Sequence, residues 1–254
     1  MELNLRGKTA IVTGGGTGIG AGITEALAQE GVNVAINYIV DEEQVIAYAD
    51  KLNKQYGTDC QAFYADVTSA DDIDKMVAKI MDTYGSIEIL VNNAGIWPTE
   101  DLLEMPDENW DRVININLNG PYYISKRVAR AMIDRDTKGI IVNISSKSSM
   151  QVNTPGHGHY VTAKAGMNML TRALAREITN RGVRVVGLLP GMVRTPMNED
   201  KWQASGLMDE YIKRIPVGRF AEAVEIGYTV AFLASDRAPN FTGTTIDITG
   251  GMLI

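Results

Sequence analysis

Two side chains at helical spacing are the first candidates for chemistry. Tyr160 and Lys164 are four residues apart, so on a helix they lie on the same face. A free phenol titrates near pH 10, but a nearby ammonium favours the phenolate and lowers its pKa. Lowering it by about 3 units takes roughly 4 kcal/mol, which a close charge supplies in a partly dry cleft but not in water. The pair therefore predicts a proton-exchanging group if it is buried, and an ordinary solvated helix face if it is not.

A glycine-rich segment near the start of the chain is the second candidate. The apolar run 9–12 leads directly into Thr13-Gly-Gly-Gly-Thr-Gly-Ile-Gly20, and a helical pattern follows. Gly14, Gly18 and Gly20 would permit a tight turn, close approach of a pyrophosphate and tight helix–strand packing. The free amides at the helix start would point at the anion. A flexible glycine turn is the alternative, but the flanking strand and helix favour dinucleotide binding.

Seven apolar runs, with helical patterns between them, predict the strands and helices that would position these residues. The runs are 9–12, 32–36, 61–64, 87–91, 140–144, 183–188 and 245–248. Alternating strands and helices predict an α/β fold, a doubly wound parallel sheet whose strands are buried on both faces. The irregular segment 192–218 follows the sixth strand, so it is predicted to be a lid at the carboxyl ends of the strands, where ligands bind in such sheets.

Bulk properties narrow the class of protein. The chain has 254 residues, of which 45% are hydrophobic, enough for one domain spanning 1–254 with a substantial core. Its formal net charge of −7 argues against a nucleic-acid partner. The single cysteine, Cys60, can form no intramolecular disulfide, and there is neither a signal-peptide pattern nor an apolar stretch of membrane-spanning length. A cytoplasmic protein is expected.

Five motifs together resemble the short-chain dehydrogenase/reductase family, and the resemblance runs essentially from end to end. The motifs are Thr13 to Gly20; Asn92-Asn-Ala-Gly95; Asn117 within Ile-Asn-Leu-Asn-Gly; Ser145-Ser146 with Tyr160 and Lys164; and Pro190-Gly191 with Thr195. The family implies one Rossmann-type domain, NAD(H) or NADP(H), and hydride transfer between a carbonyl and an alcohol. It also implies a homotetramer, commonly paired through long helices, here 110–133 and 160–179.

The resemblance gives four residues catalytic roles. Tyr160 exchanges the proton, while Lys164 lowers its pKa and binds the nicotinamide ribose. Asn117 would hold a water that extends the proton relay, or it is simply a residue of a helix kink or cap. Ser146 would hydrogen-bond the substrate oxygen. Ser145 competes with it, because the spacing from Ser146 to Tyr160 is one residue longer than the usual thirteen, and either hydroxyl could instead form a turn.

The resemblance also implies a set of cofactor contacts. They are Gly14, Thr17, Gly18, Ile19 and Gly20 in the glycine-rich loop; Tyr38 after the second strand; Asp66 and Val67 at the adenine; Asn93, Ala94 and Gly95 at the adenosine ribose; Tyr160 and Lys164 at the nicotinamide ribose; and Pro190, Gly191, Val193 and Thr195 at the nicotinamide and pyrophosphate. Asp66 has a second interpretation as a cap of the next helix, since a helix-start signal follows it.

The choice between NAD and NADP depends on the end of the second strand. Tyr38 stands where an acid would select the ribose 2′-hydroxyl. No Lys or Arg lies between Lys8 and Lys51, and three acids follow at 41–43. A 2′-phosphate would meet like charge there, so NAD is favoured; a cation from elsewhere in the fold would instead favour NADP.

Substrate contacts are predicted from the loops around the catalytic residues. The segment 147–159 is rich in hydrogen-bonding groups and contains His157, and Trp97 could stack on a ring. With Ser146 and Tyr160, these residues favour a sugar, a polyol or another polar small molecule. Both histidines of the chain, His157 and His159, fall here, but with no third ligand in view no metal site is expected.

Two other functions remain open. A 3-oxoacyl thioester reductase would need a basic patch beside the cleft, to which Arg127, Arg130 and Lys138 could contribute. A non-catalytic nucleotide-binding redox sensor would have lost the serine, tyrosine or lysine, and the chain retains all three.

Overall fold

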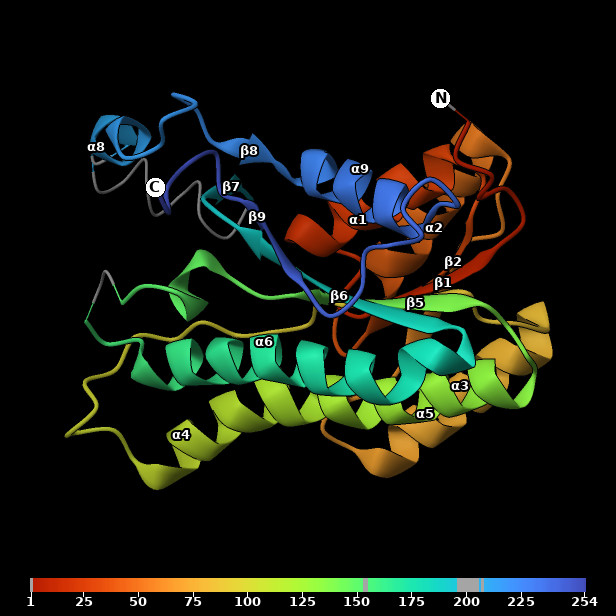
Figure 1. Ribbon diagram of the computed structural model, residues 1–254, viewed down its shortest axis with the longest axis horizontal. Helices are drawn as coiled ribbons and strands as arrows, with labels where there is room; N and C mark the ends of the chain where they lie inside the picture. Colours follow the sequence, from red (N-terminus) through yellow and green to blue (C-terminus); the bar gives the residue numbers. More distant parts are fainter. Residues whose placement is uncertain (1, 153–154, 196–205, 207) are drawn as a thin grey trace.

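A seven-stranded parallel sheet forms the centre of the molecule (Figure 1). The computed structural model describes residues 2–152, 155–195, 206 and 208–254. The strand order is β3-β2-β1-β4-β5-β6-β9, and all pairs are parallel. The strands are β1 (Thr9–Val12), β2 (Asn33–Tyr38), β3 (Gln61–Tyr64), β4 (Ile89–Asn92), β5 (Gly139–Ile144), β6 (Val183–Pro190) and β9 (Thr245–Ile248). The predicted doubly wound, Rossmann-type α/β fold is confirmed.

Helices cover both faces of the sheet. They are α1 (Gly18–Gln29), α2 (Glu42–Tyr56), α3 (Ala70–Tyr84), α4 (Asp107–Ile114), α5 (Gly120–Asp134), α6 (Gly158–Ile178), α8 (Met208–Lys213) and α9 (Ala223–Ala234). In Figure 1, α1, α2 and α9 lie on one face, and α3, α5 and α6 lie on the other. Each face therefore has its own hydrophobic cluster.

The edge strands correct one expectation from the sequence. Not all seven strands are buried on both faces: Gln61 is exposed on β3, as is Asp247 on β9, and Tyr64 is 55% exposed. These two strands are the edges of the sheet, where helices cover only part of each face. The five inner strands carry the continuous apolar runs typical of buried parallel sheets.

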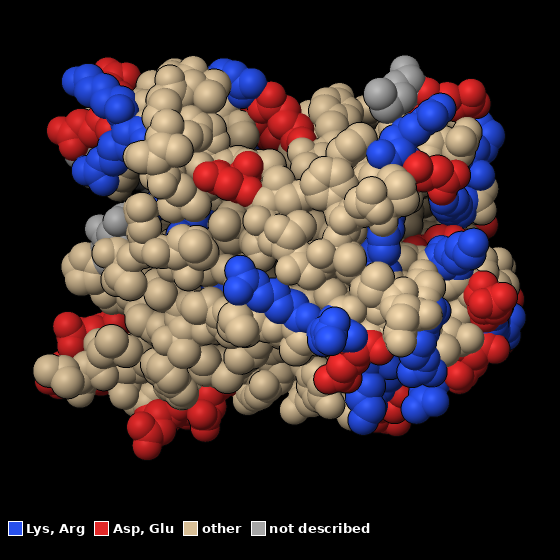
Figure 2. Space-filling view, viewed as in Figure 1, with Lys and Arg blue, Asp and Glu red and all other residues tan. Residues whose placement is uncertain are grey.

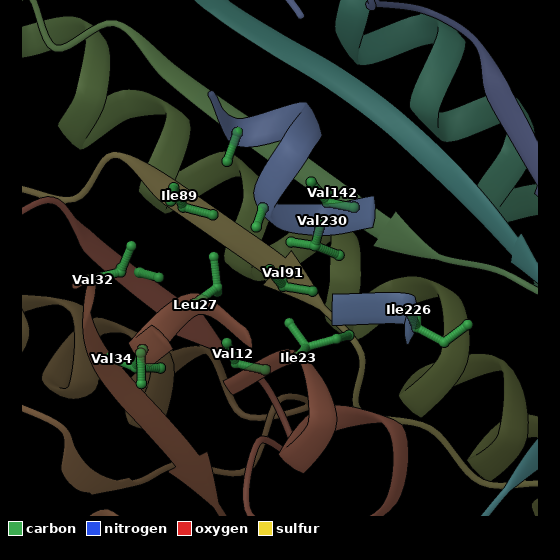
Figure 3. Close-up of a cluster of buried hydrophobic side chains, with 14 of the residues drawn as sticks. Val12, Ile23, Leu27, Val32, Val34, Ile89, Val91, Val142, Ile226 and Val230 are labelled. Atoms are coloured by element: carbon green, nitrogen blue, oxygen red, sulfur yellow. The ribbon is translucent and has the colours of Figure 1, made fainter. Parts of the chain in front are cut away.

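The cluster between α1, α9 and the sheet supports the glycine-rich loop. Ile23 and Leu27 of α1 pack with Ile226 and Val230 of α9 over the valines of the inner strands (Figure 3). Gly22 lets the two helices approach closely, since a Cβ there would collide with the backbone at the start of α9. Sequence reasoning did not single out Gly22, because its partner lies about 200 residues away.

The helix expected over 110–133 is interrupted. It consists of α4, a π-helical turn at Asn115–Asn119, and α5. A π turn inserts one residue into the helical ladder and is frequent at functional sites. Here it places Asn117, which is fully buried, beneath the carboxyl ends of the strands.

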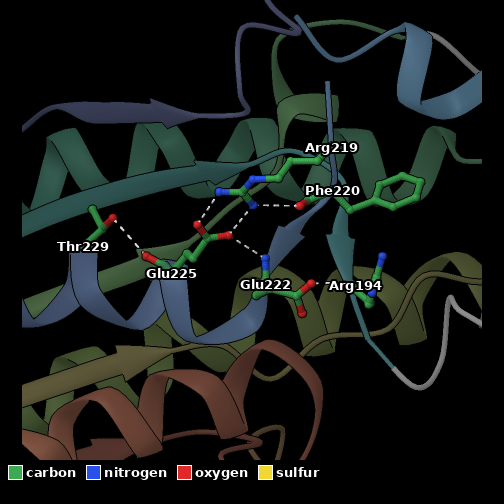
Figure 4. Close-up of polar contacts among 6 residues, drawn as sticks. All are labelled: Arg194, Arg219, Phe220, Glu222, Glu225 and Thr229. Atoms are coloured by element: carbon green, nitrogen blue, oxygen red, sulfur yellow. Dashed lines mark hydrogen bonds and ion pairs between the residues drawn. The ribbon is translucent and has the colours of Figure 1, made fainter. Parts of the chain in front are cut away.

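The predicted lid, 192–218, lies partly outside the described residues, at 196–205 and 207. Its described parts include α8 and the short strand β7 (Val193–Arg194), which pairs with β8 (Ala221–Glu222). An ionic cluster fixes β8 to α9 (Figure 4): Arg219 bonds both carboxylate oxygens of Glu225, at 2.6 and 2.7 Å, and Glu225 accepts from the Glu222 amide. These contacts lower the pKa of Glu225 to about 2, so the cluster stays charged at neutral pH.

On the face shown in Figure 2, blue and red side chains gather toward the periphery and tan residues cover much of the middle. This face carries no continuous basic stripe of the kind that phosphate backbones require. Among the described residues, no helix is both long and apolar enough to cross a membrane.

Candidate active site

A cavity of 740 Å³ lies at the carboxyl ends of the strands. Its volume is within the usual range for small-molecule and cofactor sites. The four residues predicted to contact substrate, Trp97, Ser146, His157 and Tyr160, all line it. The predicted chemistry-bearing side chains therefore meet in one hollow.

Ser146 and Tyr160 are joined by a hydrogen bond between their hydroxyl groups. Ser145 points elsewhere, and its hydroxyl donates to the carbonyl of Lys164 at 3.1 Å. The geometry thus brings Ser146, and not Ser145, to the phenol.

Lys164 lies behind Tyr160 and is only 4% exposed. Its Nζ donates to the carbonyl of Ile144 at 2.8 Å and lies 5.7 Å from the centroid of the Tyr160 ring. Burial lowers the pKa of Lys164 to about 8. Burial also raises the pKa of Tyr160, while the Ser146 hydrogen bond opposes that rise. In the chain without cofactor, desolvation therefore dominates and the ammonium donates to a carbonyl, so the expected lowering of the phenol pKa by Lys164 stays a prediction for the cofactor-bound protein.

Asn117 stabilises the interrupted helix, and its other amide atom stays available for the predicted water. Its Nδ2 donates to the carbonyls of Ile96 at 3.0 Å and Val113 at 3.1 Å, which stabilises the π turn. Its Oδ1 is buried with no hydrogen-bond partner among the described residues. Because a buried acceptor without a partner is rare, this oxygen is well suited to hold an ordered water.

The glycine-rich loop has the shape needed to hold a phosphate. Gly14 and Gly18 have φ values of +60° and +51°, a left-handed conformation that other residues rarely adopt. At Gly20 a Cβ would collide with the carbonyl of Gly14, so the loop closes on itself there. The side chain of the exposed Thr17 makes no capping bond at the start of α1. These features fit the pyrophosphate of a dinucleotide.

Two side chains not assigned from the sequence lock this loop. The Thr13 hydroxyl accepts from the amides of Asn93 and Ala94, at 2.9 and 3.0 Å. Asn37 Oδ1 accepts from the Gly14 amide at 3.3 Å, and its Nδ2 donates to the Ala65 carbonyl at 3.0 Å. The available signal for Asn37 was an asparagine at the end of a buried apolar strand. Asn93 itself bonds the carbonyls of Thr13 and Gly14 and does not line a cavity among those described.

A second cavity, of 570 Å³, lies on the other side of the loop, where the adenosine is expected. Six of the predicted cofactor residues line it: Gly14, Tyr38, Asp66, Val67, Ala94 and Gly95. Arg112 of α4 lines it too, so a cation does reach this region from a distant part of the chain. Tyr38 is hydrogen-bonded to Glu42, and burial, followed by this contact, raises the pKa of Tyr38 to about 12.

Asp66 does not cap α3. Its Oδ1 accepts from the amide and hydroxyl of Thr68, at 2.8 and 2.7 Å. The cap is Ser69, whose hydroxyl accepts from the Asp72 amide at 3.2 Å. The capping interpretation of Asp66 is therefore wrong: the helix begins three residues later than a cap at 66 would require, and Asp66 shapes the turn at the cavity wall.

The loop after β6 contacts both the catalytic cavity and the glycine-rich loop. Pro190, Gly191 and Val193 line the cavity together with Ile19 from the first turn of α1. Thr195 packs beside Gly18, with its methyl group 3.6 Å from where a Gly18 Cβ would lie. A cofactor that crosses the glycine-rich loop would therefore have its ends in the two cavities.

The aromatic wall of the catalytic cavity consists of Trp97 and His157. Their rings stack at 4.6 Å, and Trp97 lies 6.4 Å from the ring of Tyr160. His157 Nδ1 is 3.0 Å from the carbonyl of Pro98, which orients the imidazole. His159 is fully buried beside the cavity and does not line it. In the part of the chain that the structure describes, no three His, Cys, Asp or Glu side chains form a group suited to a metal ion.

The three residues considered for a basic patch, Arg127, Arg130 and Lys138, do not line the cavity. Arg127 makes two hydrogen bonds to Asp74, at 2.6 and 3.0 Å. Lys138 precedes β5 and so lies at the opposite end of that strand from Ser145.

Comparison with known proteins decides the family. A family model described as enoyl-(acyl carrier protein) reductase matches residues 14–253. A solved short-chain type dehydrogenase/reductase from Mycobacterium marinum superimposes with a TM-score of 0.92 at 31% identity, over 99% of this chain and 98% of that one. The chain belongs to the short-chain dehydrogenase/reductase family. It is accordingly an oxidoreductase that uses a nicotinamide cofactor and acts on alcohol or carbonyl groups.

Two relatives within the family illustrate its range of substrates. The 3-oxoacyl-[acyl-carrier-protein] reductase of Staphylococcus aureus is 39% identical over 245 residues, covering 96% of this chain and 98% of the relative. The L-sorbose reductase of Gluconobacter frateurii, solved with NADPH and L-sorbose, has a TM-score of 0.93 at 26% identity, over 100% of this chain and 99% of that one. Both similarities extend over nearly the whole chain, so they do not by themselves select a substrate.

The serine role is testable by paired substitutions. We expect Ser146→Ala to lower kcat by about 100-fold, because it removes a hydroxyl bonded to the Tyr160 phenol. Ser145→Ala should act mainly on stability, since its hydroxyl bonds the backbone of α6. Steady-state kinetics and thermal unfolding of both variants provide the measurement. A larger loss of kcat in Ser145→Ala would reverse the assignment.

Proposed function

We propose that this protein transfers a hydride between NAD(H) and a secondary alcohol or carbonyl of a polar small molecule, such as a sugar or polyol. The observation that supports this most directly is the Ser146–Tyr160 hydrogen bond at the wall of the 740 Å³ cavity, with Lys164 buried behind it. A hydroxyl pair in a partly dry cleft suits proton exchange with a substrate oxygen.

Each residue has a defined task in this proposal. The nicotinamide cofactor supplies or accepts the hydride when bound. Tyr160 gives a proton to the substrate oxygen during reduction and takes it back during oxidation, while Ser146 hydrogen-bonds the same oxygen. Lys164 binds the ribose hydroxyls, and its charge there favours the phenolate. Asn117 Oδ1, which lacks a partner in the described chain, binds a water that connects this relay to solvent.

The competing substrate is a 3-oxoacyl thioester, which the similarity to the Staphylococcus reductase supports. The L-sorbose reductase supports a sugar instead. The experiment is a turnover assay with sugars, polyols, simple ketones and 3-oxoacyl thioesters, with each cofactor in turn. Turnover of thioesters alone would replace the sugar proposal, and turnover of nothing in a protein that binds neither cofactor would refute both.

We expect NADH to bind at least about tenfold more tightly than NADPH, because a 2′-phosphate near Tyr38 meets Glu42 and its acidic neighbours. Fluorescence titration of the purified protein measures both affinities. Arg112 is the cation that could reverse this preference, since it lines the same cavity. Tighter binding of NADPH than of NADH would contradict the NAD proposal. If Arg112 causes that preference, the preference should be lost in Arg112→Gln and kept in the control Arg130→Gln, on the exposed side of α5.

The remaining parts of the proposal concern the lid and assembly. Met192, Tyr211 and Arg214 belong to the segment 192–218 and line the cavity, which supports a substrate-covering role for it. A homotetramer follows from family resemblance, and the exposed Tyr122 on α5 and Met169 on α6 are consistent with helix pairing. Sedimentation equilibrium would test the assembly.

A further inference from the structure

Two cationic side chains face the catalytic cavity. Lys147 follows Ser146 directly and Arg214 follows α8 directly, and both residues line the cavity. Lys147 is half-buried, whereas Arg214 is exposed and its guanidinium lies 5.6 Å from the Tyr211 ring centroid, which also lines the cavity. The two charges interact, since Arg214 contributes, after burial, to a lowered pKa of Lys147.

Neither cation has an acidic partner in the described part of the chain. The ion pairs there involve Lys8, Lys75, Arg127, Arg194 and Arg219 only. No aspartate or glutamate among the described residues lines the cavity. Two like charges facing one partly dry cavity repel each other, and a bound anion between them would remove that repulsion. No role in the proton relay or in cofactor binding accounts for either residue.

We propose that the substrate carries an oxyanion, a carboxylate or phosphate, that binds between Lys147 and Arg214 while its alcohol or carbonyl group lies at Ser146 and Tyr160. This inference rests on the proposed function and narrows its substrate to anionic compounds such as hydroxy acids, oxo acids or sugar acids. Arginine matches an oxyanion with two parallel hydrogen bonds, and the lysine adds a point charge.

The position of Lys147 next to Ser146 also bears on which anionic substrates fit the cavity. Lys147 is adjacent to Ser146 and both residues line the cavity, so an oxyanion held by Lys147 would share that cavity with the reacting carbon. In a phosphopantetheine thioester the phosphate is many bonds from the 3-oxo group. The arrangement therefore favours a small acid over a carrier-bound acyl chain.

Matched substrate pairs provide the test. Two pairs differ only in having a carboxylate or a CH₂OH group: gluconate with sorbitol, and 3-hydroxybutyrate with 1,3-butanediol. A third pair, glycerol 3-phosphate with glycerol, differs in a phosphate, so comparing it with the first two distinguishes phosphate from carboxylate. Dissociation constants are measured in the presence of NAD or NADP in a Tyr160→Phe background, so that binding needs no turnover. For at least one pair, we expect the anion to bind about 10- to 100-fold more tightly than its neutral partner. That ratio should fall toward one in Lys147→Gln and in Arg214→Gln.

Lys213→Gln is the matched control, because it removes one positive charge next to Arg214 at an exposed residue that does not line the cavity. The ratio should persist in this variant. Equal binding of anion and neutral partner in every pair, or an anion preference unchanged in Lys147→Gln and Arg214→Gln, would overturn the inference. A preference for an acetoacetyl phosphopantetheine thioester over acetoacetate would also overturn it. Cofactor titration and the turnover assay separate this result from failure of the proposed function, which would appear as turnover of thioesters alone, or as no turnover in a protein that binds neither cofactor.

Discussion

Tyr160→Phe is expected to lower kcat by about 1,000-fold while leaving the dissociation constant of the cofactor within about threefold. The substitution removes only the hydroxyl that exchanges a proton with the substrate, and general acid–base catalysis typically contributes 10²- to 10⁴-fold. The ring that remains still packs near Trp97 and Lys164, at 6.4 Å and 5.7 Å, so the cavity wall keeps its shape. Steady-state kinetics and nicotinamide fluorescence measure the two quantities separately.

Tyr122→Phe is the control for this substitution. Tyr122 lies exposed on α5 and lines neither described cavity, so removing its hydroxyl should leave kcat unchanged. Substantial turnover by the Tyr160 variant would contradict the assignment of the proton donor. Loss of cofactor binding in that variant would mean that the phenol holds the nucleotide rather than the substrate oxygen.

Gly20→Ala is expected to weaken cofactor binding by about 100-fold and to destabilise the fold by about 1–3 kcal/mol. An added Cβ collides with the carbonyl of Gly14 and would lie 2.9 Å from its carbonyl carbon and 2.6 Å from Nδ2 of Asn93. Gly14 belongs to the locked loop and Asn93 is hydrogen-bonded to it, so neither can move without opening the phosphate cradle. Titration with NADH and NADPH, together with thermal unfolding, tests both effects.

Gly57→Ala is the control that separates the steric collision at Gly20 from the backbone strain of a non-glycine residue at a positive φ. Gly57 ends α2 with φ +68°, and a Cβ there would meet nothing within 4 Å. That variant should lose about 1 kcal/mol of stability with no change in cofactor affinity. Similar affinity losses in both variants would show that the loop does not depend on the close approach at Gly20.

The fold was predictable because each inner strand has an unbroken apolar run and each run is followed by a helical pattern. The runs at 9–12, 61–64 and 245–248 match β1, β3 and β9 to the residue. The edge position of β3 and β9 was not predictable in the same way, since strand order depends on contacts between distant segments. The partial exposure of these edge strands explains how Gln61 and Asp247 are tolerated in a sheet of this type.

The candidate site was predictable as a set of residue types but not as an electrostatic arrangement. Tyr160 and Lys164 share a helix face; Lys164 is buried and Tyr160 is half-buried at the cavity wall, as the spacing requires for a functional pair. Their pKa shifts depend on desolvation and, for Tyr160, on the Ser146 hydroxyl, and no local pattern encodes these effects. Arg112 and Arg214 reach the two cavities from segments far from the motifs, so only the folded chain brings them there.

The close contact between α1 and α9 has a consequence for synthesis of the chain. The helix that begins the phosphate cradle leaves the ribosome early, but the helix whose approach Gly22 permits is made about 200 residues later. At typical elongation rates of about 5–20 residues per second, that interval lasts on the order of 10–40 s. Until then Ile23 and Leu27 lack the covering provided by Ile226 and Val230. We therefore expect α1, and the phosphate cradle that it begins, to reach its final packing only after α9 has emerged.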